Sequence, residues 1–565
     1  MNPNSRGKAG RNGHLLRPAR DAGKSARAGP FNLIWGCPLY YVDYSTINNR
    51  RAGWSGVGVS TGRNEREGLM TRKPFVCDAG LSAVIRACIV LSMTFGLSLC
   101  GTPALQAAGL SAELDAIIGS RHLRGSDFGL TVYSINQDRF IRNVNGDRTL
   151  VPASNQKLLV TAAALIELGP DFKFTTRLYA SGPVKDGVLY GDLILRGGGD
   201  PNLSGRFNGG DVCHIVNEWV RAVRDAGITR MTGRLIIDDS LFDTEFFHPS
   251  WPENQKHRWY AAGIGALSLN DSCIQLTVEP TSLGAPAEFD FEPPTQYVTV
   301  RNECKTVSGR STDHIVISRK GREIYLGGKI GAGSKGYSAG VAIDDPGLFA
   351  GTVFYDRLCE AGIRPYAVLR AEGTPDYGNM RLLLEYGSQD LATTLKVTNG
   401  KSQNFYADTL LKYLGARSHG KGTFENGIAA VREILTSHGL LSETVVMDDG
   451  CGLSHENRIS TTALVKVMES MYRSPDRDAY VGSLAVPGDP EGTLKKRLRG
   501  ERHNARIYAK SGYINRVKAL SGYVLRDDGE VLIFSFIVNR YSPKSAWQVN
   551  NLQNILMRKL ADCRM

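Results

Sequence analysis

The stretch from Leu158 to Leu168 constrains the fold most, because its apolar residues predict a helix that must be buried inside a domain. Ser154 and Lys157 stand at the head of this helix as a Ser-x-x-Lys pair, and Gly169-Pro170 ends it. Residues three apart lie on one face of a helix, so the lysine amine can reach the serine hydroxyl. If a low-polarity site lowers its pKa, the Lys157 amine can act as the base that activates Ser154 as a nucleophile.

The net charge of the 565-residue chain, +12, lies mostly outside its folded body. Residues 1–107 hold 14 Lys plus Arg against 5 Asp plus Glu, which leaves 54 against 51 for the rest. A folded body with almost no net charge does not attract a polyanion such as nucleic acid. Nucleic acid is therefore not expected as a partner.

Residues 70–107 have the pattern of a secretory signal peptide. A basic start after Met70 precedes an apolar run of 13 residues from Ala87 to Leu99, and small residues lead up to Ala107, where we expect cleavage. A membrane-spanning helix needs about 20 apolar residues. An uncleaved anchor is the alternative.

Residues 1–69 precede the signal and are rich in Arg, Gly and Asn without apolar periodicity. They are expected to be disordered, or to reflect a wrongly assigned start codon with Met70 as the true initiator. The sequence thus predicts export across the inner membrane into the periplasm or cell envelope. Peripheral association with the membrane is left open.

The chain after the signal divides by its periodicity into three parts. Residues 108–175 hold strands and the Ser154 helix, and residues 176–383 hold short alternating strands separated by Gly, Asp, Asn and Pro. Residues 384–565 predict helices, then an antiparallel meander, then a C-terminal helix. The middle part is therefore expected to be a β-rich insert within one α+β domain.

Cysteine usage gives little further information. None of the cysteines after Ala107 forms a C-x-x-C pair, so neither a zinc site nor a thioredoxin-like motif is predicted. A disulfide between Cys273 and Cys304 and free buried thiols are equal alternatives. No cofactor and no catalytic metal are expected, since His-Glu-x-x-His is also missing.

Two later tripeptides complete a pattern with the first pair: Ser402-Gln403-Asn404 between predicted helices, and Lys510-Ser511-Gly512 on a predicted strand. Each motif alone is weak, because Ser5 and Lys8 also form Ser-x-x-Lys. Taken singly, Ser154 could simply cap a helix and Lys510 could lie on the surface. Chance rarely supplies all three in this order and context.

These three motifs resemble those of the penicillin-recognising serine D,D-peptidases. More closely, the chain resembles the class C low-molecular-mass penicillin-binding proteins, D-alanyl-D-alanine carboxypeptidase/endopeptidases of the cell wall. The segments 191–203, 449–454 and 520–524 carry the resemblance, with the 248-residue gap between Ser154 and Ser402. It implies a β-lactamase/transpeptidase-like catalytic domain, an antiparallel sheet flanked by helices, with β-rich domains inserted between the first and second motifs.

The resemblance also implies catalytic roles. Ser154 attacks the carbonyl of the penultimate D-alanine, Lys157 takes its proton, and an acyl-enzyme forms that water hydrolyses. Ser402, helped by Lys510, returns a proton to the leaving amine. The partners implied are peptidoglycan stem peptides, with β-lactam antibiotics as covalent inhibitors.

Binding roles follow from the same resemblance. Lys510 and Ser511 hold the terminal carboxylate of the substrate, Asn404 holds a peptide amide, and Gly512 lets the stem peptide lie along the strand. The backbone N–H groups of Ser154 and Tyr513 form the oxyanion hole.

Three positions depart from the pattern of the family. Ser511 stands where Thr is usual, His455 where many members carry Arg, and Gln255 where some members use an acid to grip a diaminopimelate amine. The preference for that stem peptide is therefore in doubt.

Other readings of the sequence were weighed. Gly336-Tyr-Ser-Ala-Gly fits a nucleophile elbow with Ser338, but a glycine-rich loop precedes it where a strand is required. A serine β-lactamase shares the three motifs but seldom carries so large an insert. A catalytically silent wall-binding protein is the non-enzyme alternative.

Overall fold

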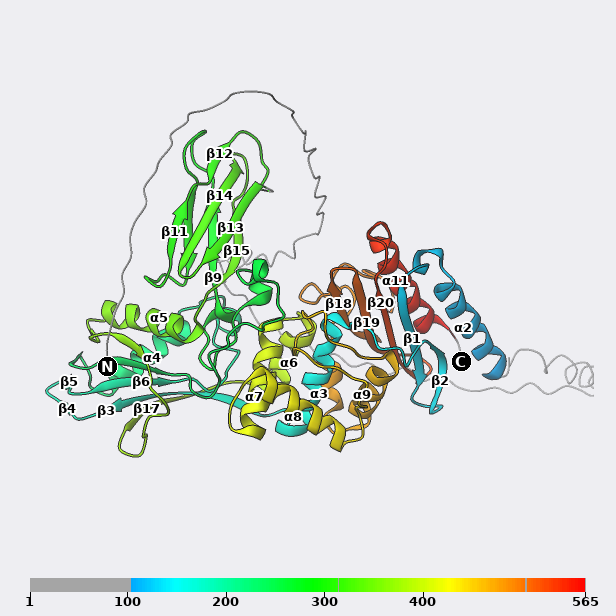
Figure 1. Ribbon diagram of the computed structural model, residues 1–565, viewed down its shortest axis with the longest axis horizontal. Coiled ribbons are helices and arrows are strands. Elements are labelled where there is room, and N and C mark those ends of the chain that lie inside the picture. Colours follow the sequence, from blue (N-terminus) through cyan, green and yellow to red (C-terminus); the bar gives the residue numbers. More distant parts are fainter. Residues whose placement is uncertain (1–102, 313, 504–505, 564–565) are drawn as a thin grey trace, which may run out of the picture. The chain divides into compact units, whose positions relative to one another are not determined.

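The computed structural model describes residues 103–312, 314–503 and 506–563 (Figure 1). The predicted N-terminal extension and most of the predicted signal peptide lie outside these residues. Helix α2 (Pro103–Ile118) spans the expected cleavage point at Ala107, and Leu110, Leu114 and Ile117 on this helix are buried. Among the described residues, no helix has the length and hydropathy needed to cross a bilayer.

One antiparallel sheet joins the two ends of the described chain. Its order is β18-β19-β20-β1-β2, so strands from before the Ser154 helix pair with the C-terminal meander. The bounds are β1 (Asp127–Ser134), β2 (Arg139–Val144), β18 (Ile507–Ile514), β19 (Val517–Leu525) and β20 (Val531–Asn539). All nine residues of β20 are buried, as expected of a central strand that is covered on both faces.

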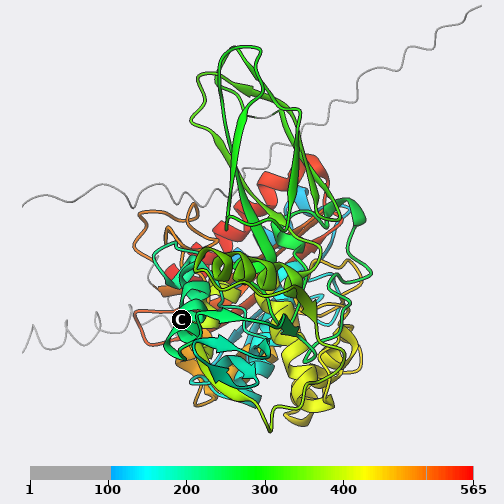
Figure 2. The ribbon, with the colours of Figure 1, turned by 90° about the vertical axis from the view of Figure 1, so that its left-hand side faces the viewer.

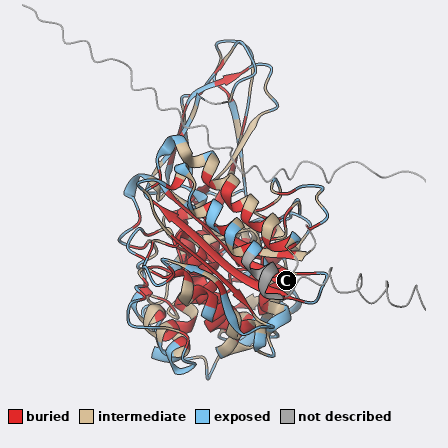
Figure 3. Cartoon of the chain, turned by 90° about the vertical axis from the view of Figure 1, so that its right-hand side faces the viewer, coloured by how far each residue is buried: buried red, intermediate tan, exposed pale blue. Residues whose placement is uncertain are grey.

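Helices cover both faces of this sheet, and its strands β1, β19 and β20 are mostly buried (Figure 3), whereas the edge strand β2 is mostly exposed or half-buried. Helix α2 packs with α11 (Ala546–Asp562) on one face, and Leu110, Leu114 and Leu556 belong to their shared core. Helices α3 (Lys157–Leu168) and α9 (Thr461–Arg473) lie on the other face.

Helix α3 is the centre of the helical layer, as its sequence predicted. The side chains from Lys157 to Leu165 are buried, and α3 contacts α6, α7, α8 and α9. The further bounds are α6 (Leu391–Gly400), α7 (Asn404–His419), α8 (Phe424–Ser437) and α10 (Arg477–Gly482). An apolar helix can be stable in this place because its neighbours surround it.

The chain enters and leaves the insert on two paired strands, β3 (Lys173–Ser181) and β17 (Arg381–Asp390). Both strands belong to a mixed sheet of order β16-β8-β6-β3-β17, in which β17 is an edge strand. Its other strands are β6 (Asp192–Arg196), β8 (Leu235–Asp238) and β16 (Val368–Arg370). Helices α4 (His214–Asp225) and α5 (Pro346–Glu360) pack on it (Figure 2). This part is therefore α/β, whereas the sequence reading had only strands before α5.

The rest of the insert holds small sheets joined by loops and short 3-10 helices, with no further α-helix among the described residues. One sheet has the order β10-β9-β15, and in another β14 pairs with β11, β12 and β13. The bounds are β9 (Cys273–Glu279), β10 (Glu288–Glu292), β11 (Thr299–Asn302), β12 (Lys305–Val307), β13 (His314–Lys320), β14 (Glu323–Gly331) and β15 (Tyr337–Ala342). A smaller sheet joins β4 (Val184–Lys185), β5 (Val188–Leu189) and β7 (Arg230–Met231).

The insert contains Ser338 and the cysteines Cys273 and Cys304, for which the sequence left alternatives. Ser338 lies inside β15, opposite Thr277 of β9, so it is not on the strand-to-helix turn that a nucleophile elbow requires. The suggested disulfide between Cys273 and Cys304 is wrong, because both thiols are free and buried.

Candidate active site

The three motifs lie on three different elements that meet in space. Ser154 belongs to a short 3-10 helix, Ala153–Gln156, that continues into α3 at Lys157. Ser402 lies two residues before Asn404, the first residue of α7. Lys510 is in β18, the edge strand that packs against the Ser154 turn.

Two serine–lysine pairs form where these elements meet. The Lys157 Nζ donates to Ser154 Oγ at 3.2 Å, and it also donates to Asn404 Oδ1 and to the Cys451 carbonyl, both at 2.7 Å. The Lys510 Nζ donates to Ser402 Oγ at 2.8 Å and to the Ser511 carbonyl at 2.7 Å. Three acceptors thus fix the direction of the Lys157 amine, and one of them is the hydroxyl that it would deprotonate.

Burial disfavours the protonated, positively charged form of both lysines. Both side chains are fully buried, and this desolvation lowers the pKa of Lys157, although the nearby Asp408 and Asp449 carboxylates oppose the shift. The pKa of Lys510 lies well below its usual value, because of burial and the charge of Lys157. Two close buried amines do not both stay protonated, so one can accept a proton at moderate pH.

Two residues beside the nucleophile adopt left-handed backbone conformations. Ala153 has φ of 48° and Ser402 has φ of 60°. Such conformations cost about 1–3 kcal/mol for residues with a side chain and often mark functional sites. They set the angles at which Ser154 and Ser402 approach the lysines.

A loop from Asp449 to Ser454 supports Lys157 from behind. The Asp449 carboxylate is buried and accepts hydrogen bonds from Gly452 N, Ser454 N, Asn457 Nδ2 and Trp251 Nε1, and from Cys451 Sγ at 3.6 Å. Asp408 Oδ1 accepts from Gly450 N at 2.8 Å. These bonds fix the Cys451 carbonyl that holds the Lys157 amine.

Gly452 packs directly against the turn that holds Ser154. Its φ is +83°, and an added Cβ would lie 1.9 Å from the Ala153 carbonyl oxygen. Only glycine permits this approach. The sequence had pointed to this segment through family resemblance, without indicating that its Cys451 carbonyl holds the Lys157 amine or that Gly452 contacts the Ser154 turn.

The predicted binding residues lie around the two pairs. Ser511 Oγ donates to Thr493 Oγ1 at 3.1 Å. A Cβ on Gly512 would come within 2.9 Å of the Pro152 carbonyl and 3.1 Å of the Ser154 nitrogen. Gly512 therefore lets β18 approach the Ser154 backbone, which differs from the role expected of it along the stem peptide.

Asn404 lies at the site and contacts both Lys157 and the insert. Its Oδ1 accepts from Lys157, and its Nδ2 donates to the Tyr260 carbonyl at 2.7 Å. In this structure the amide positions the lysine and ties it to the insert. Gln255 lies in the same segment of the insert, and its Oε1 accepts from the Tyr260 hydroxyl at 3.4 Å.

Tyr513 and His455 are both exposed. The Tyr513 ring lies under Lys518 Nζ, 4.6 Å from its centre. His455 lines a cavity of about 390 Å³, whose wall includes Val151 and Asn515, neighbours in sequence of the first and third motifs. Among the described residues, His455 makes no hydrogen bond or ion pair with the two serine–lysine pairs.

The outer edge of β18 can accept an extended ligand. Ala509 exchanges two backbone hydrogen bonds with Ala485 on this edge. Every second residue of a strand presents its N–H and C=O groups to the same edge. The backbone groups of Ser511 and Tyr513 therefore face the same edge as those of Ala509, beyond the bridge to Ala485. Among the described residues, no cluster of His, Cys, Asp and Glu is arranged to hold a metal ion.

Comparisons with known proteins agree with this geometry. Residues 110–559 match the model of the D-Ala-D-Ala carboxypeptidase 3 (S13) family. The chain is 31% identical over 448 residues to a D-alanyl-D-alanine carboxypeptidase from Actinomadura sp. (strain R39), covering 77% of this chain and 81% of that protein. It is 25% identical over 429 residues to D-alanyl-D-alanine carboxypeptidase DacB from Haemophilus influenzae, covering 74% and 86%.

A solved structure shares the fold. Penicillin binding protein 4 from Haemophilus influenzae aligns with a TM-score of 0.67 at 22% identity, over 80% of this chain and 98% of that one. This similarity confirms the predicted fold class.

Proposed function

Because the chain belongs to the D-Ala-D-Ala carboxypeptidase 3 (S13) family, we propose that it is a serine D,D-peptidase that hydrolyses the D-alanyl-D-alanine bond of peptidoglycan stem peptides. Cross-links of the same D,D type fit the same chemistry. The observation that carries the proposal is the pair of buried serine–lysine contacts.

In the first step, Ser154 Oγ attacks the carbonyl carbon of the penultimate D-alanine while the neutral Lys157 amine takes its proton. The tetrahedral oxyanion is held by the backbone N–H groups of Ser154 and Tyr513. The Lys510–Ser402 pair then delivers a proton to the leaving amine, the C–N bond breaks, and terminal D-alanine departs. The acyl group remains as an ester on Ser154.

In the second step, water loses a proton to the same lysine–serine network and attacks the ester. The ester bond breaks and Ser154 regains its proton. The hydroxyl of Ser511, whose carbonyl accepts from the Lys510 amine, is suited to the terminal carboxylate of the substrate. The stem peptide extends along the outer edge of β18 by backbone hydrogen bonds.

Labelling with fluorescent penicillin tests this function. We expect wild type to be labelled covalently, Ser154→Ala to lose label and D-alanine release, and Ser338→Ala to keep both as the matched control. A wild type that is not labelled would overturn the proposal. Fast turnover of the β-lactam, without a stable adduct, would instead indicate the β-lactamase alternative.

We also propose that the protein acts in the periplasm or cell envelope after cleavage near Ala107. Cleavage there removes the start of α2 but keeps Leu110, Leu114 and Ile117, whose side chains are buried. Mass spectrometry of the protein from a native membrane-free fraction should give an N-terminus close to Ala108. An intact N-terminus at Met1 or Met70 would contradict processing.

A further inference from the structure

A second cavity, remote from the serine–lysine pairs, collects three arginines. It has a volume of about 330 Å³ and lies between β3, the Gly197–Gly198 turn after β6, and the C-terminal half of α7. Its lining residues are Thr175, Arg177, Arg196, Gly197, Gly198, Leu241, Tyr413, Ala416 and Arg417. None of them is acidic. The wall that a ligand would meet is therefore cationic.

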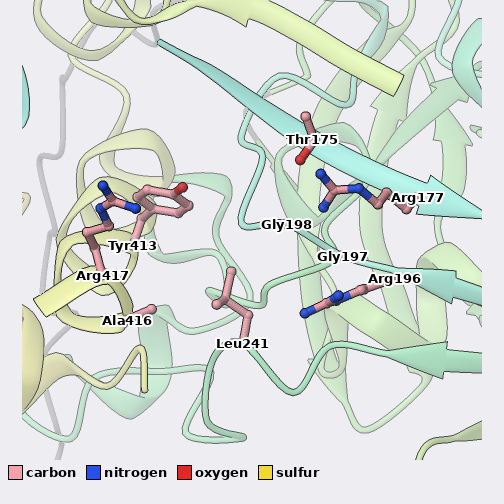
Figure 4. Close-up of a pocket in the computed structure, with 9 residues that line it drawn as sticks. All are labelled: Thr175, Arg177, Arg196, Gly197, Gly198, Leu241, Tyr413, Ala416 and Arg417. Carbon is pink, nitrogen blue, oxygen red and sulfur yellow. The ribbon is translucent and has the colours of Figure 1, made fainter. Parts of the chain in front are cut away.

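The sheet register shows that two of these arginines are forced together. Arg177 of β3 stands directly opposite Arg196 of β6 in the antiparallel ladder. Like charges directly opposite each other destabilise a sheet. Figure 4 shows both side chains extending from the strands in the same direction, toward Tyr413 and Arg417 of α7.

The carboxylates that offset these charges stand outside the pair. Glu385 is opposite Arg177 on β17, and Asp238 is opposite Arg196 on β8. The Arg177–Glu385 contact is 2.6 Å, whereas Arg196 lies 3.6 Å from Asp238 and Arg417 lies 3.9 Å from Glu167. Four residues are therefore aligned across neighbouring strands in the order Glu385, Arg177, Arg196, Asp238. The cavity is lined by the two arginines in the centre of this row. A purely structural ladder would alternate the charges.

From this arrangement we propose that the cavity is an anion-binding subsite that takes a carboxylate of the peptidoglycan peptide. Guanidinium groups bind carboxylates through paired hydrogen bonds. Leu241, Ala416 and the Tyr413 ring supply an apolar wall for the carbon skeleton attached to the charge. The flanking acids reduce the total charge of the region, which suits a group with one negative charge better than a polyphosphate.

The subsite is separate from the reacting centre. Asn404 begins α7 and Arg417 lies thirteen residues later, so the helix rise of 1.5 Å per residue separates their backbones by roughly 20 Å. One small substrate cannot fill both places. The inference rests on the proposed function, because a polymeric wall offers a second acidic peptide to be held while another reacts at Ser154.

Isothermal titration tests the subsite without any reaction. The probe is N-acetyl-L-alanyl-D-glutamine, which has no D-alanine and whose one carboxylate is the α-carboxylate that a γ-linked D-glutamate keeps free in a stem peptide. The comparison ligand is its neutral α-amide. We expect the acid to bind wild type, to bind R177Q/R417Q at least tenfold more weakly, and the amide not to bind. The matched control R221Q removes an exposed arginine that pairs with Glu218 on α4, and its affinity should equal that of wild type.

Several outcomes would overturn the proposal. These are equal affinity in wild type and R177Q/R417Q with unchanged thermal unfolding, equal affinity for acid and amide, or binding of a glycerol phosphate oligomer in place of the acid. The titration needs no acylation, so it is independent of the peptidase assignment. If the wild type is not labelled by penicillin but still binds the acid in the titration, the proposed peptidase function is contradicted and the anion-binding subsite is supported.

A kinetic measurement adds a second readout. With a cross-linked dimeric muropeptide as substrate, R177Q/R417Q should raise KM at least threefold with little change in kcat. Penicillin acylation should stay unchanged in the same variant. An unchanged KM would contradict a role of the subsite in holding the wall.

Discussion

At the scale of single residues, the main question is how two buried lysines activate two serines. Burial lowers the pKa of Lys157 and, together with the charge of Lys157, lowers that of Lys510. The neutral amine is the form that accepts the Ser154 proton. Because a lowered pKa moves deprotonation to lower pH, the acylation rate should rise with pH and level off below the usual pKa of a lysine.

Lys157→Arg tests this assignment. Arginine keeps its proton at all working pH values, so the variant should lose penicillin acylation by about 100-fold or more. Asp408→Asn keeps the acceptor for Gly450 N but removes a negative charge that raises the pKa of Lys157. Its rate should therefore rise at lower pH than that of wild type. Stopped-flow acylation across pH 5–10 measures both, and an unshifted Asp408→Asn profile would contradict the electrostatic coupling.

Gly452→Ala tests the contact behind the nucleophile. The new Cβ would meet the Ala153 carbonyl at 1.9 Å, and φ of +83° disfavours alanine. We expect a loss of at least about 1–2 kcal/mol of unfolding free energy, with slower acylation because the Ser154 turn must move. Gly482→Ala is the control, since a Cβ there has open space. Urea unfolding and acylation rates of the two variants give the comparison.

At the scale of elements, the insert contributes to the site through the segment 251–260. Trp251 Nε1 donates to the buried Asp449 at 2.9 Å, and the Tyr260 carbonyl accepts from Asn404. Trp251→Phe should leave Asp449 one donor short, at a cost of about 1–3 kcal/mol. The acylation rate should fall too, because Asp449 fixes the loop whose Cys451 carbonyl holds the Lys157 amine. Trp547→Phe, at an exposed position, should change neither stability nor acylation.

Sequence reasoning found some elements and missed others for physical reasons. The apolar run after Lys157 and the alternating strands of the meander carry their burial in their periodicity, so α3 and β18 to β20 were predictable. Helix α4 was missed within a segment read as strands. The Asp449 loop has no periodicity, and its role depends on tertiary hydrogen bonds to Lys157 and Trp251. The opposition of Arg177 and Arg196 needs the strand register, which the sequence does not state.

At the scale of the whole molecule, the first and last described helices hold each other in place. Leu110, Leu114 and Ile117 of α2 lie in one core with α11, so the chain closes its sheet only when both ends are present. Cleavage near Ala107 keeps all three of these side chains in the protein. The body from residue 108 onward should therefore contain everything that stability and acylation require.

Two truncations test this. A protein that starts at Ala108 should match the full chain in thermal unfolding and in penicillin acylation. A protein that starts at Ser120 loses the three buried side chains, each worth about 1.5–3 kcal/mol before the entropy of ordering the helix is subtracted. Its unfolding temperature should fall by about 5 °C or more, while the serine–lysine pairs, which make no contact with α2, should still acylate at low temperature. Equal unfolding temperatures for the two truncations would show that α2 does not stabilise the sheet.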